Sequence, residues 1–258
     1  MVERVLASNA GPMTGAGTNT YLVHDHAGTV AVVDPGPEDP RHLQAILDSA
    51  RPFGRIASIL VTHGHLDHLP GAFPLRERTG ATLVGHARLP GVHRELVDGE
   101  EWAVGRVRIK ALETPGHTDD SLCYWEPTER SLFTGDLVAG TGTVIVDDSH
   151  GALARYMSSL ERLLALGESR IYPGHGPIAE DGPGKLREYL SHRSQREQQI
   201  VAVLARDGPR SVQQIVEQVY EGLARELLPM AARNVRAHLD KLATEGRAAE
   251  RDGAWRLT

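Results

Sequence analysis

The chain of 258 residues has a single cysteine, Cys123, and only 5% aromatic side chains. One cysteine excludes a disulfide within the chain and gives no sign of an oxidising compartment. No stretch approaches the ~18 consecutive apolar residues that a membrane-spanning helix needs. Residues 1–13 also lack the apolar core of a signal peptide. These deficits predict a cytoplasmic protein with no membrane partner.

Basic residues are scarcer than acidic ones, with 28 Lys and Arg against 34 Asp and Glu and a net charge of −6. Affinity for phosphate comes mainly from clustered Lys and Arg. The balance therefore argues against a surface devoted wholly to nucleic acid, although it leaves room for a local basic groove. A hydrophobic content of 40% is enough for one large domain, or for one domain and a small appendage. Nothing in the composition specifies an oligomeric state.

The first 180 residues alternate short apolar runs with glycine and proline turns, which is typical of strands connected by turns and helices. Helices are predicted at residues 41–50 and 151–167, where apolar residues recur at helical spacing. The predicted strands are residues 20–25, 29–36, 56–63, 81–86, 106–117, 121–127 and 131–136, and residues 170–177 are predicted to hold one short strand and a loop. This order predicts an α/β (α+β) fold in which mixed sheets are flanked by helices.

The sequence changes character near residue 185. One long charged helix is predicted over residues 185–206, ended by Gly208 and Pro209. A helix, a turn, a second helix and a hairpin turning at Asp252–Gly253 follow, and this order resembles a winged-helix unit. We therefore predict a first domain at residues 1–184, then a linker helix and winged-helix-like domain at 185–258.

The winged-helix-like unit is electrically balanced, with eight basic and eight acidic residues from Asp207 onward. Its second helix is expected to expose Arg233, Arg236 and Lys241, which could contact phosphates. Elsewhere the chain offers isolated residues of metal-binding or reactive type. We expect Cys123 to be buried in a strand, and the following histidines to be solvated: His24, His26, His42 and His192.

Metal-ligand residues crowd the stretch Val61–Gly71, "VTHGHLDHLPG", which directly follows an apolar run. It holds His63, His65, Asp67 and His68. Histidine nitrogens and carboxylates suit Zn²⁺, and Fe or Mn accept similar ligands. One loop cannot surround two ions alone, so a binuclear site needs ligands from other strand ends. Three such residues, each preceded by glycine after an apolar run, are His117, Asp136 and His175.

The motif "HGHLDH" resembles the H-x-H-x-D-H signature of the metallo-β-lactamase superfamily, and the later "GH", "GD" and "GH" elements resemble its remaining motifs in order. The opening "NAGPMTGAGTNTYLV", the segment "TPGHTDDSLCY" and the C-terminal unit resemble the lactamase-beta-2-like group of that superfamily. The resemblance implies an αββα metallo-β-lactamase sandwich followed by a small winged-helix-like domain.

The resemblance also implies which residues hold two Zn²⁺ ions, with Fe or Mn as alternatives. His63, His65 and His117 would bind the first ion; Asp67, His68 and His175 would bind the second; and Asp136 would bridge both. Asp34, in "VVDPG", would support the histidine loop from behind. Class B β-lactamases commonly have cysteine at one ligand position, and Asp136 stands at that position here, so the site resembles the hydroxyacylglutathione hydrolase and phosphodiesterase branches instead.

The implied activity is hydrolysis by a hydroxide that bridges the two metals, with Asp67 also steering the nucleophile. For the lactamase-beta-2-like group the implied substrate is single-stranded RNA, which makes an endoribonuclease the first hypothesis. The alternative is hydrolysis of a small-molecule ester or acyl thioester, of the carrier-protein, coenzyme A or hydroxyacylglutathione type. A minor alternative is a DNA-binding protein that senses a ligand through its metal-binding domain.

Overall fold

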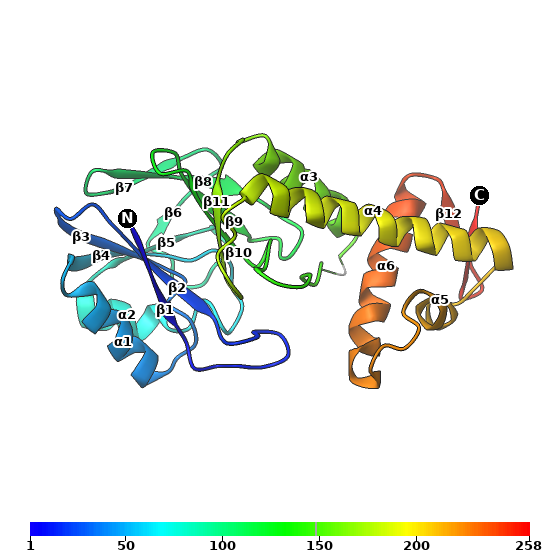
Figure 1. The fold of residues 1–258 in the computed structure, drawn as a ribbon, viewed down its shortest axis with the longest axis horizontal. Coiled ribbons are helices and arrows are strands. Elements are labelled where there is room, and N and C mark those ends of the chain that lie inside the picture. The colour runs from blue at the N-terminus through cyan, green and yellow to red at the C-terminus, as the bar shows by residue number, and fades with distance from the viewer. Residues whose placement is uncertain (148) are drawn as a thin grey trace.

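The computed structural model describes residues 1–147 and 149–258. Figure 1 shows an elongated molecule in which a large β-sandwich and a small domain are connected by one long helix, α4 (Gly182–Asp207). The amino terminus lies on the sandwich and the carboxyl terminus on the small domain. No helix among the described residues is both long and apolar enough to cross a membrane.

Two sheets form the sandwich, and their strands pair in the order of the chain. The six-stranded sheet has the order β1 (Val2–Leu6), β2 (Asn19–His24), β3 (Gly28–Val33), β4 (Gly54–Leu60), β5 (Thr82–Gly85) and β6 (Arg94–Glu95). The five-stranded sheet has the order β11 (Arg170–Pro173), β10 (Ser131–Gly135), β9 (Leu122–Glu126), β8 (Val107–Glu113) and β7 (Glu101–Val104). Both sheets mix parallel and antiparallel pairs, as predicted.

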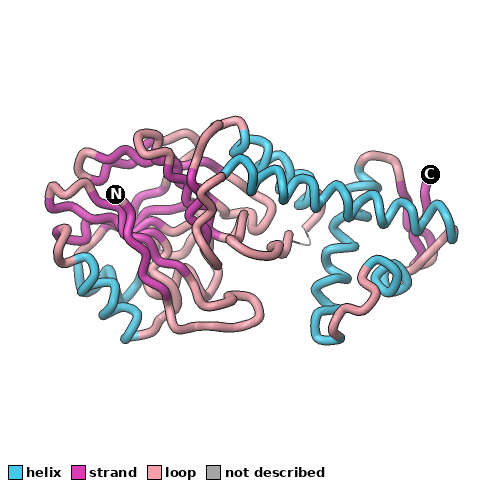
Figure 2. The backbone as a smooth tube through the Cα atoms, viewed as in Figure 1, coloured by secondary structure: helices cyan, strands magenta, loops and turns pink. Residues whose placement is uncertain are grey.

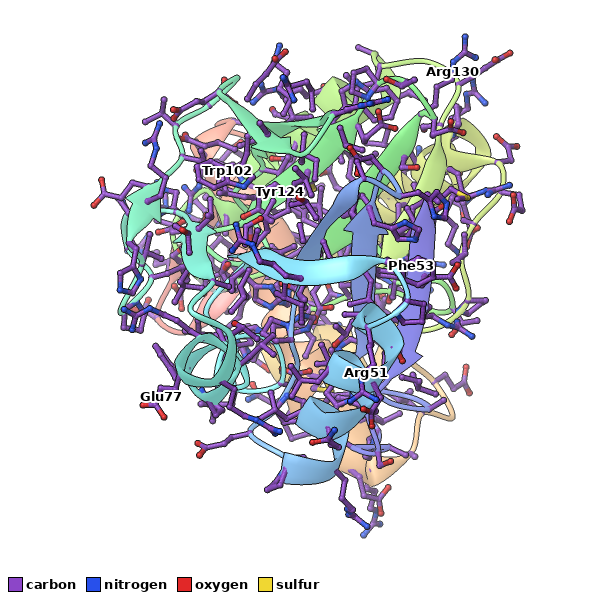
Figure 3. All side chains as sticks on the ribbon, turned by 90° about the vertical axis from the view of Figure 1, so that its left-hand side faces the viewer. Arg51, Phe53, Glu77, Trp102, Tyr124 and Arg130 are labelled. Atoms are coloured by element: carbon purple, nitrogen blue, oxygen red, sulfur yellow. The ribbon has the colours of Figure 1, made fainter. Side chains whose placement is uncertain are left out.

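Helices cover the outer face of each sheet, which gives four layers (Figure 2). Helices α1 (Pro40–Ala50) and α2 (Ala72–Thr79) pack on the first sheet through Ile46 and Leu75. Helices α3 (Ala152–Leu164) and α4 pack on the second sheet. A third cluster fills the space between the sheets, and Figure 3 shows one of its members, Tyr124, among the strands. The predicted αββα sandwich is confirmed.

The small domain is a winged helix. Its elements after α4 are α5 (Val212–Val219), the 3₁₀ helix η1 (Arg225–Leu227), α6 (Leu228–Thr244), β12 (Ala248–Arg251) and β13 (Ala254–Leu257). A capping box between Ser211 and Gln214 begins α5. Asp252 and Gly253 both have positive φ, 54° and 77°, as the two central residues of a type I′ hairpin turn require. The hairpin predicted at these residues is confirmed.

Helix α4 belongs to both domains. Leu186 and Tyr189, in its first half, pack in the core of the sandwich beneath α3. Ile200 and Leu204, in its second half, pack in the core of the winged helix. The helix begins three residues before the predicted start, because Asp181 caps it and Pro183 occupies its first turn. The division at residues 184 and 185 stays a prediction.

Of the four histidines expected to be solvated, His26 is exposed and His192 partly exposed, but His24 and His42 are buried. His24 is fully buried and stacks on Phe53 with ring centroids 3.8 Å apart. His42 is 4% exposed, and its Nε2 lies 2.8 Å from the Thr20 hydroxyl. Lys241 was expected to be exposed, but it is paired with Glu197 at 2.8 Å. These positions depend on contacts between residues distant in sequence, which local polarity does not reveal. Cys123 is fully buried in β9, as predicted.

His238, on α6, gives the winged helix a predictable response to acid. The side chain is fully buried, and neither ring nitrogen has a hydrogen-bond partner among the described residues. Burial first, and then nearby cations such as Arg193, lowers the pKa of His238 to about 3. The folded protein therefore keeps this ring neutral where the unfolded chain, with a pKa of about 6.5, takes up a proton. The associated stability is complete above pH 6.5 and is lost as pH falls toward 3.

We predict that His238→Leu will flatten the pH dependence of unfolding. Between pH 7 and pH 5 the wild-type protein should lose about 2 kcal/mol of unfolding free energy through this histidine alone, and the variant should not. Denaturant titrations at both pH values, followed by circular dichroism, measure the difference. Equal losses in the two proteins would contradict the prediction.

Candidate metal centre

Strand direction brings the predicted ligands to one edge of the sandwich. Strands β8, β10 and β11 run in one direction, because β9 is antiparallel to β8 and β10, and β10 is parallel to β11. Their carboxyl ends lead to His117, Asp136 and His175. In the other sheet β3 and β4 are parallel, and their carboxyl ends lead to Asp34 and to the histidine loop at residues 61–71.

Glycines before the ligands permit close packing at this edge. A Cβ on Gly174 would lie 2.5 Å from Asp136 Oδ1 and 2.6 Å from His68 Cε1. A Cβ on Gly135, whose φ is 49°, would lie 2.3 Å from the Thr62 hydroxyl oxygen. Any larger residue at either position would displace a predicted ligand or its support. The "GD" and "GH" elements of the sequence therefore have a steric basis.

Seven side chains form two adjoining clusters that share Asp136. One cluster contains His63, His65, His117 and Asp136, and the other contains Asp67, His68, Asp136 and His175. Within each cluster one nitrogen or oxygen per residue lies within 4.8 Å of the others. The membership of the clusters coincides with the two ligand sets that the resemblance implies. Their metal binding stays a prediction.

Distances between ring nitrogens and carboxylate oxygens are short throughout the clusters. His117 Nε2 lies 3.1 Å from His65 Nδ1, and His68 Nε2 lies 3.4 Å from His175 Nε2. Asp136 Oδ2 lies 3.4 Å from His175 Nε2 and 3.8 Å from His117 Nε2. Asp67 Oδ2 lies 3.1 Å from His175 Nε2. Imidazole nitrogens from opposite sheets thus point at a common space.

Hydrogen bonds on the far side of each ring fix which nitrogen faces that space. His117 Nδ1 lies 2.7 Å from the Ile145 carbonyl oxygen, and His175 Nδ1 lies 3.3 Å from the carbonyl oxygen of Gly17. A carbonyl can only accept, so both Nδ1 atoms carry the proton and both Nε2 atoms are free to bind a cation. His63 Nδ1 lies 3.0 Å from the Thr62 hydroxyl, which leaves its Nε2 facing inward.

Asp34 supports the histidine loop from behind, in the position expected of it. Its carboxylate accepts hydrogen bonds from the Thr62 amide and hydroxyl, each at 2.7 Å, and from His68 Nδ1 at 2.9 Å. The side chain is 2% exposed. Asp34 has φ of 49°, a left-handed conformation that Asp and Asn tolerate better than most residues. This carboxylate both orients His68 and holds the residue that precedes His63.

The electrostatics of the clusters favour a cation. Burial alone would lower the pKa of His68, but the carboxylates of Asp136 and Asp34 outweigh burial and raise that pKa well above its usual value. Burial opposes protonation of His175 too, yet Asp136 and Asp67 raise its pKa to about 9. Burial would raise the pKa of Asp136, but His68 and His175 hold it well below its usual range. The carboxylates therefore attract positive charge into a buried space.

The donor set fits a pair of metal ions. His63 Nε2 and Asp136 Oδ1 are buried, and neither has a hydrogen-bond partner among the described residues. Buried polar atoms without partners are rare, and a bound cation is one of the accepted reasons for them. Imidazole nitrogens together with carboxylate oxygens suit Zn²⁺, Fe and Mn. The two clusters therefore make a plausible binuclear metal site.

A pocket of about 380 Å³ opens above the clusters. It is lined by His65, Asp67, His117, Asp136 and His175, and by Met13, Thr118, Asp119, Ile145, Asp147 and Arg233. Arg233 comes from α6 of the winged helix, so both domains form the pocket. The sequence indicated Arg233 as a surface cation and gave no signal that it lines this pocket.

A four-layered sandwich with a carboxylate shared between two clusters of histidine and aspartate is the arrangement of a metallo-hydrolase with a plausible metal site. A family model, the metallo-beta-lactamase superfamily, matches residues 13–175, and a second, the beta-lactamase associated winged helix domain, matches residues 211–255. The chain belongs to the metallo-beta-lactamase superfamily, and the resemblance predicted from its motifs is confirmed.

Several curated proteins are similar to the chain. A beta-lactamase-like protein 2 homolog from Caenorhabditis elegans is 34% identical, with 95% of this chain and 85% of that protein covered. The homolog from Drosophila melanogaster is also 34% identical, with 95% and 89% covered. An atrochrysone carboxyl ACP thioesterase from Aspergillus fumigatus is 36% identical, with 79% of this chain and 64% of that protein covered.

Solved structures agree in fold over the whole chain. A metallo-beta-lactamase family protein from Thermus thermophilus superposes with a TM-score of 0.81 at 23% identity, covering 100% of this chain and 98% of that one. A beta-lactamase domain protein from Burkholderia ambifaria has a TM-score of 0.86 at 19% identity, covering 100% and 91%. The sandwich and the winged helix therefore occur together in other proteins.

We predict that Asp34→Asn will weaken metal binding at the cluster of His68 while the fold is kept. Asparagine tolerates the backbone conformation, but its amide would donate toward His68 Nδ1 and move the ring proton to Nε2. The affinity for one ion should fall about 10–100-fold, which a titration with a competing chelator measures. Asp39→Asn, the same change at the cap of α1, is the control. Unaltered affinity in Asp34→Asn would contradict this role.

Proposed function

We propose that the chain is a binuclear metal-dependent hydrolase, with a pair of Zn²⁺ ions as the first choice and Fe or Mn as alternatives. The observation that carries the proposal is Asp136, which belongs to both clusters. When bound, two such ions supply a strong nucleophile from water at neutral pH and polarise the bond to be cleaved. His63, His65 and His117 would hold one ion, and His68 and His175 the other.

Asp67 is the residue that we propose as catalytic. It would bind the second ion and orient the attacking water. Its side chain is 27% exposed and lines the pocket, whereas His68 beside it is fully buried. Asp67 Oδ2 lies 3.1 Å from His175 Nε2, so this oxygen contacts the cluster. The carboxylate is thus placed between the metal cluster and the space available to substrate.

We infer that the substrate is an acyl thioester. The similar Aspergillus protein is named as a thioesterase that acts on an acyl carrier protein, and the match covers most of this chain. The pocket combines the apolar side chains of Met13 and Ile145 with the guanidinium of Arg233. Apolar walls suit an acyl group, and a guanidinium suits a phosphate such as those of coenzyme A or a carrier-protein arm.

Single-stranded RNA is the second candidate substrate. Arg233 favours it, because its side chain lines the pocket and guanidinium groups recognise phosphates. Arg88 and Arg155 contact Asp119, a pocket residue, at 3.5 Å and 3.0 Å. The DNA-binding alternative has less support, since Lys241 is held in ion pairs with Glu197 and Glu245. The cytoplasmic location stays a prediction.

Paired turnover assays on the zinc-loaded protein test the reaction and the substrate together. One assay uses acyl-coenzyme A and an acylated carrier protein, the other a mixed single-stranded RNA, and each is repeated with Asp136→Ala. Thioester cleavage that is abolished in the variant, together with a loss of bound metal, is the expected result. Cleavage of RNA alone would establish the second candidate. Full activity in Asp136→Ala would refute the binuclear centre.

The role of Arg233 gives a separate prediction. Arg233→Gln should raise KM for acyl-coenzyme A about tenfold, the loss expected for one hydrogen bond to a charged group. KM for an N-acetylcysteamine thioester, which has no phosphate, should stay within about twofold of the wild-type value by the same reasoning. Arg236→Gln, an exposed residue of the same helix, is the matched control. Equal effects of Arg233→Gln on both thioesters would contradict phosphate recognition.

A further inference from the structure

Arg193 is a fully buried cation on α4, between the two domains. Among the described residues its side-chain hydrogen bonds go to an amide oxygen and a carbonyl oxygen, and its Nε has no hydrogen-bond partner. Burying a charge is costly unless the surroundings compensate it. The few contacts that Arg193 does make must therefore hold the guanidinium in one place.

These contacts connect four separate segments. Arg193 Nη1 donates to Asn234 Oδ1 on α6 at 2.8 Å, and Nη2 donates to the Val144 carbonyl at 2.6 Å. The guanidinium carbon lies 5.1 Å from the centre of the Tyr156 ring on α3. Figure 1 shows α4 running from the sandwich, beside α3, across α6 of the winged helix. Arg193 thus joins the winged helix to the segment that follows Asp136.

Residues 136–147 form that segment, which we call the bridging loop. It begins at the shared carboxylate and is bonded to both neighbouring ligand loops. The Ile145 carbonyl accepts from His117 Nδ1 at 2.7 Å, and the Asp147 amide donates to the Gly116 carbonyl at 2.9 Å. The Gly140 amide donates to the His175 carbonyl at 2.8 Å. The position of the bridging loop therefore sets the orientation of the His117 ring.

We propose that Arg193 is a positioning residue for the first metal site, and that Asn234 of the winged helix fixes it in this role. Arg193 holds the Val144 carbonyl, and the next residue, Ile145, supplies the carbonyl that orients His117. That hydrogen bond keeps the proton on Nδ1 and leaves Nε2 as the donor to metal. The inference rests on the proposed role of His117 as a ligand, but not on any substrate.

A neighbouring arginine of α4 provides a matched comparison. Arg196 Nη1 donates to the Val219 carbonyl at 2.9 Å, and its guanidinium lies 4.0 Å from the centre of the Tyr220 ring. Arg196 thus makes the same kinds of contact as Arg193, but within the winged helix. Any effect of Arg193 on metal that Arg196 does not share comes from the bridging loop.

Arg193→Met tests the proposal on the full chain. Methionine fills much of the same volume without a charge, although the Val144 carbonyl and Asn234 Oδ1 lose their donor, and a buried acceptor left without a donor costs about 1–3 kcal/mol. We expect the affinity for one of two Zn²⁺ ions to fall about tenfold, the second to be unchanged, and thermal unfolding to stay cooperative at a lower melting temperature. Chelator competition, metal content and thermal unfolding measure these quantities. Arg196→Met should leave both affinities unaltered.

Asn234 variants keep the test decisive if Arg193→Met does not fold. Asn234→Ala removes the acceptor of Arg193 and should lower the affinity for the same Zn²⁺ ion. Asn234→Asp retains an acceptor and should keep that affinity near the wild-type value. Two unaltered affinities in Arg193→Met, or in Asn234→Ala when the first variant is unfolded, would overturn the proposal. So would a loss of affinity of the same size in Arg196→Met.

Discussion

The carboxylate of Asp136 lies where the two ligand clusters and the two sheets meet. It is almost entirely enclosed by imidazole rings from two sheets, and such a group is stable only with positive charge beside it. His68 reaches it from the first sheet and His175 from the second, so the two sheets must meet at one edge. The sandwich brings the two sheets together at this edge, because strands that run in the same direction end there.

The sequence best predicted those residues whose side-chain type and local backbone pattern both indicated a ligand. His63, His65, Asp67 and His68 could be recognised because one loop after an apolar strand crowds them together. His117, Asp136 and His175 could be recognised because each follows glycine, and those glycines lie where a side chain would strike a ligand, its support or an adjoining helix. Patterns of strand and helix predicted most of the sandwich, because its helices have one apolar face and strands such as β2, β9 and β10 are short apolar runs buried on both faces.

The rest of the structure depends on contacts that no local pattern encodes. Strand β1 was not predicted, because its adjacent charged residues Glu3 and Arg4 look like an exposed segment until β2 pairs with it. Arg193 looks like one more cation on a charged helix, and only the packing of α3, α4 and α6 shows that it is buried. Arg233 likewise lines the pocket only because of how α6 packs, which no local pattern reveals. Burial of polar residues between domains is a tertiary property.

The structure gives the winged helix a role that its fold alone would not suggest. Winged helices occur in proteins with many functions, so the fold is weak evidence for nucleic-acid binding. Here α6 presents Arg233 to the pocket and Asn234, the next residue, to Arg193. Adjacent residues of one helix thus line the pocket and hold Arg193, the residue that we propose as a support of the first metal site. The domain is better understood as one wall of the active site than as an independent binding module.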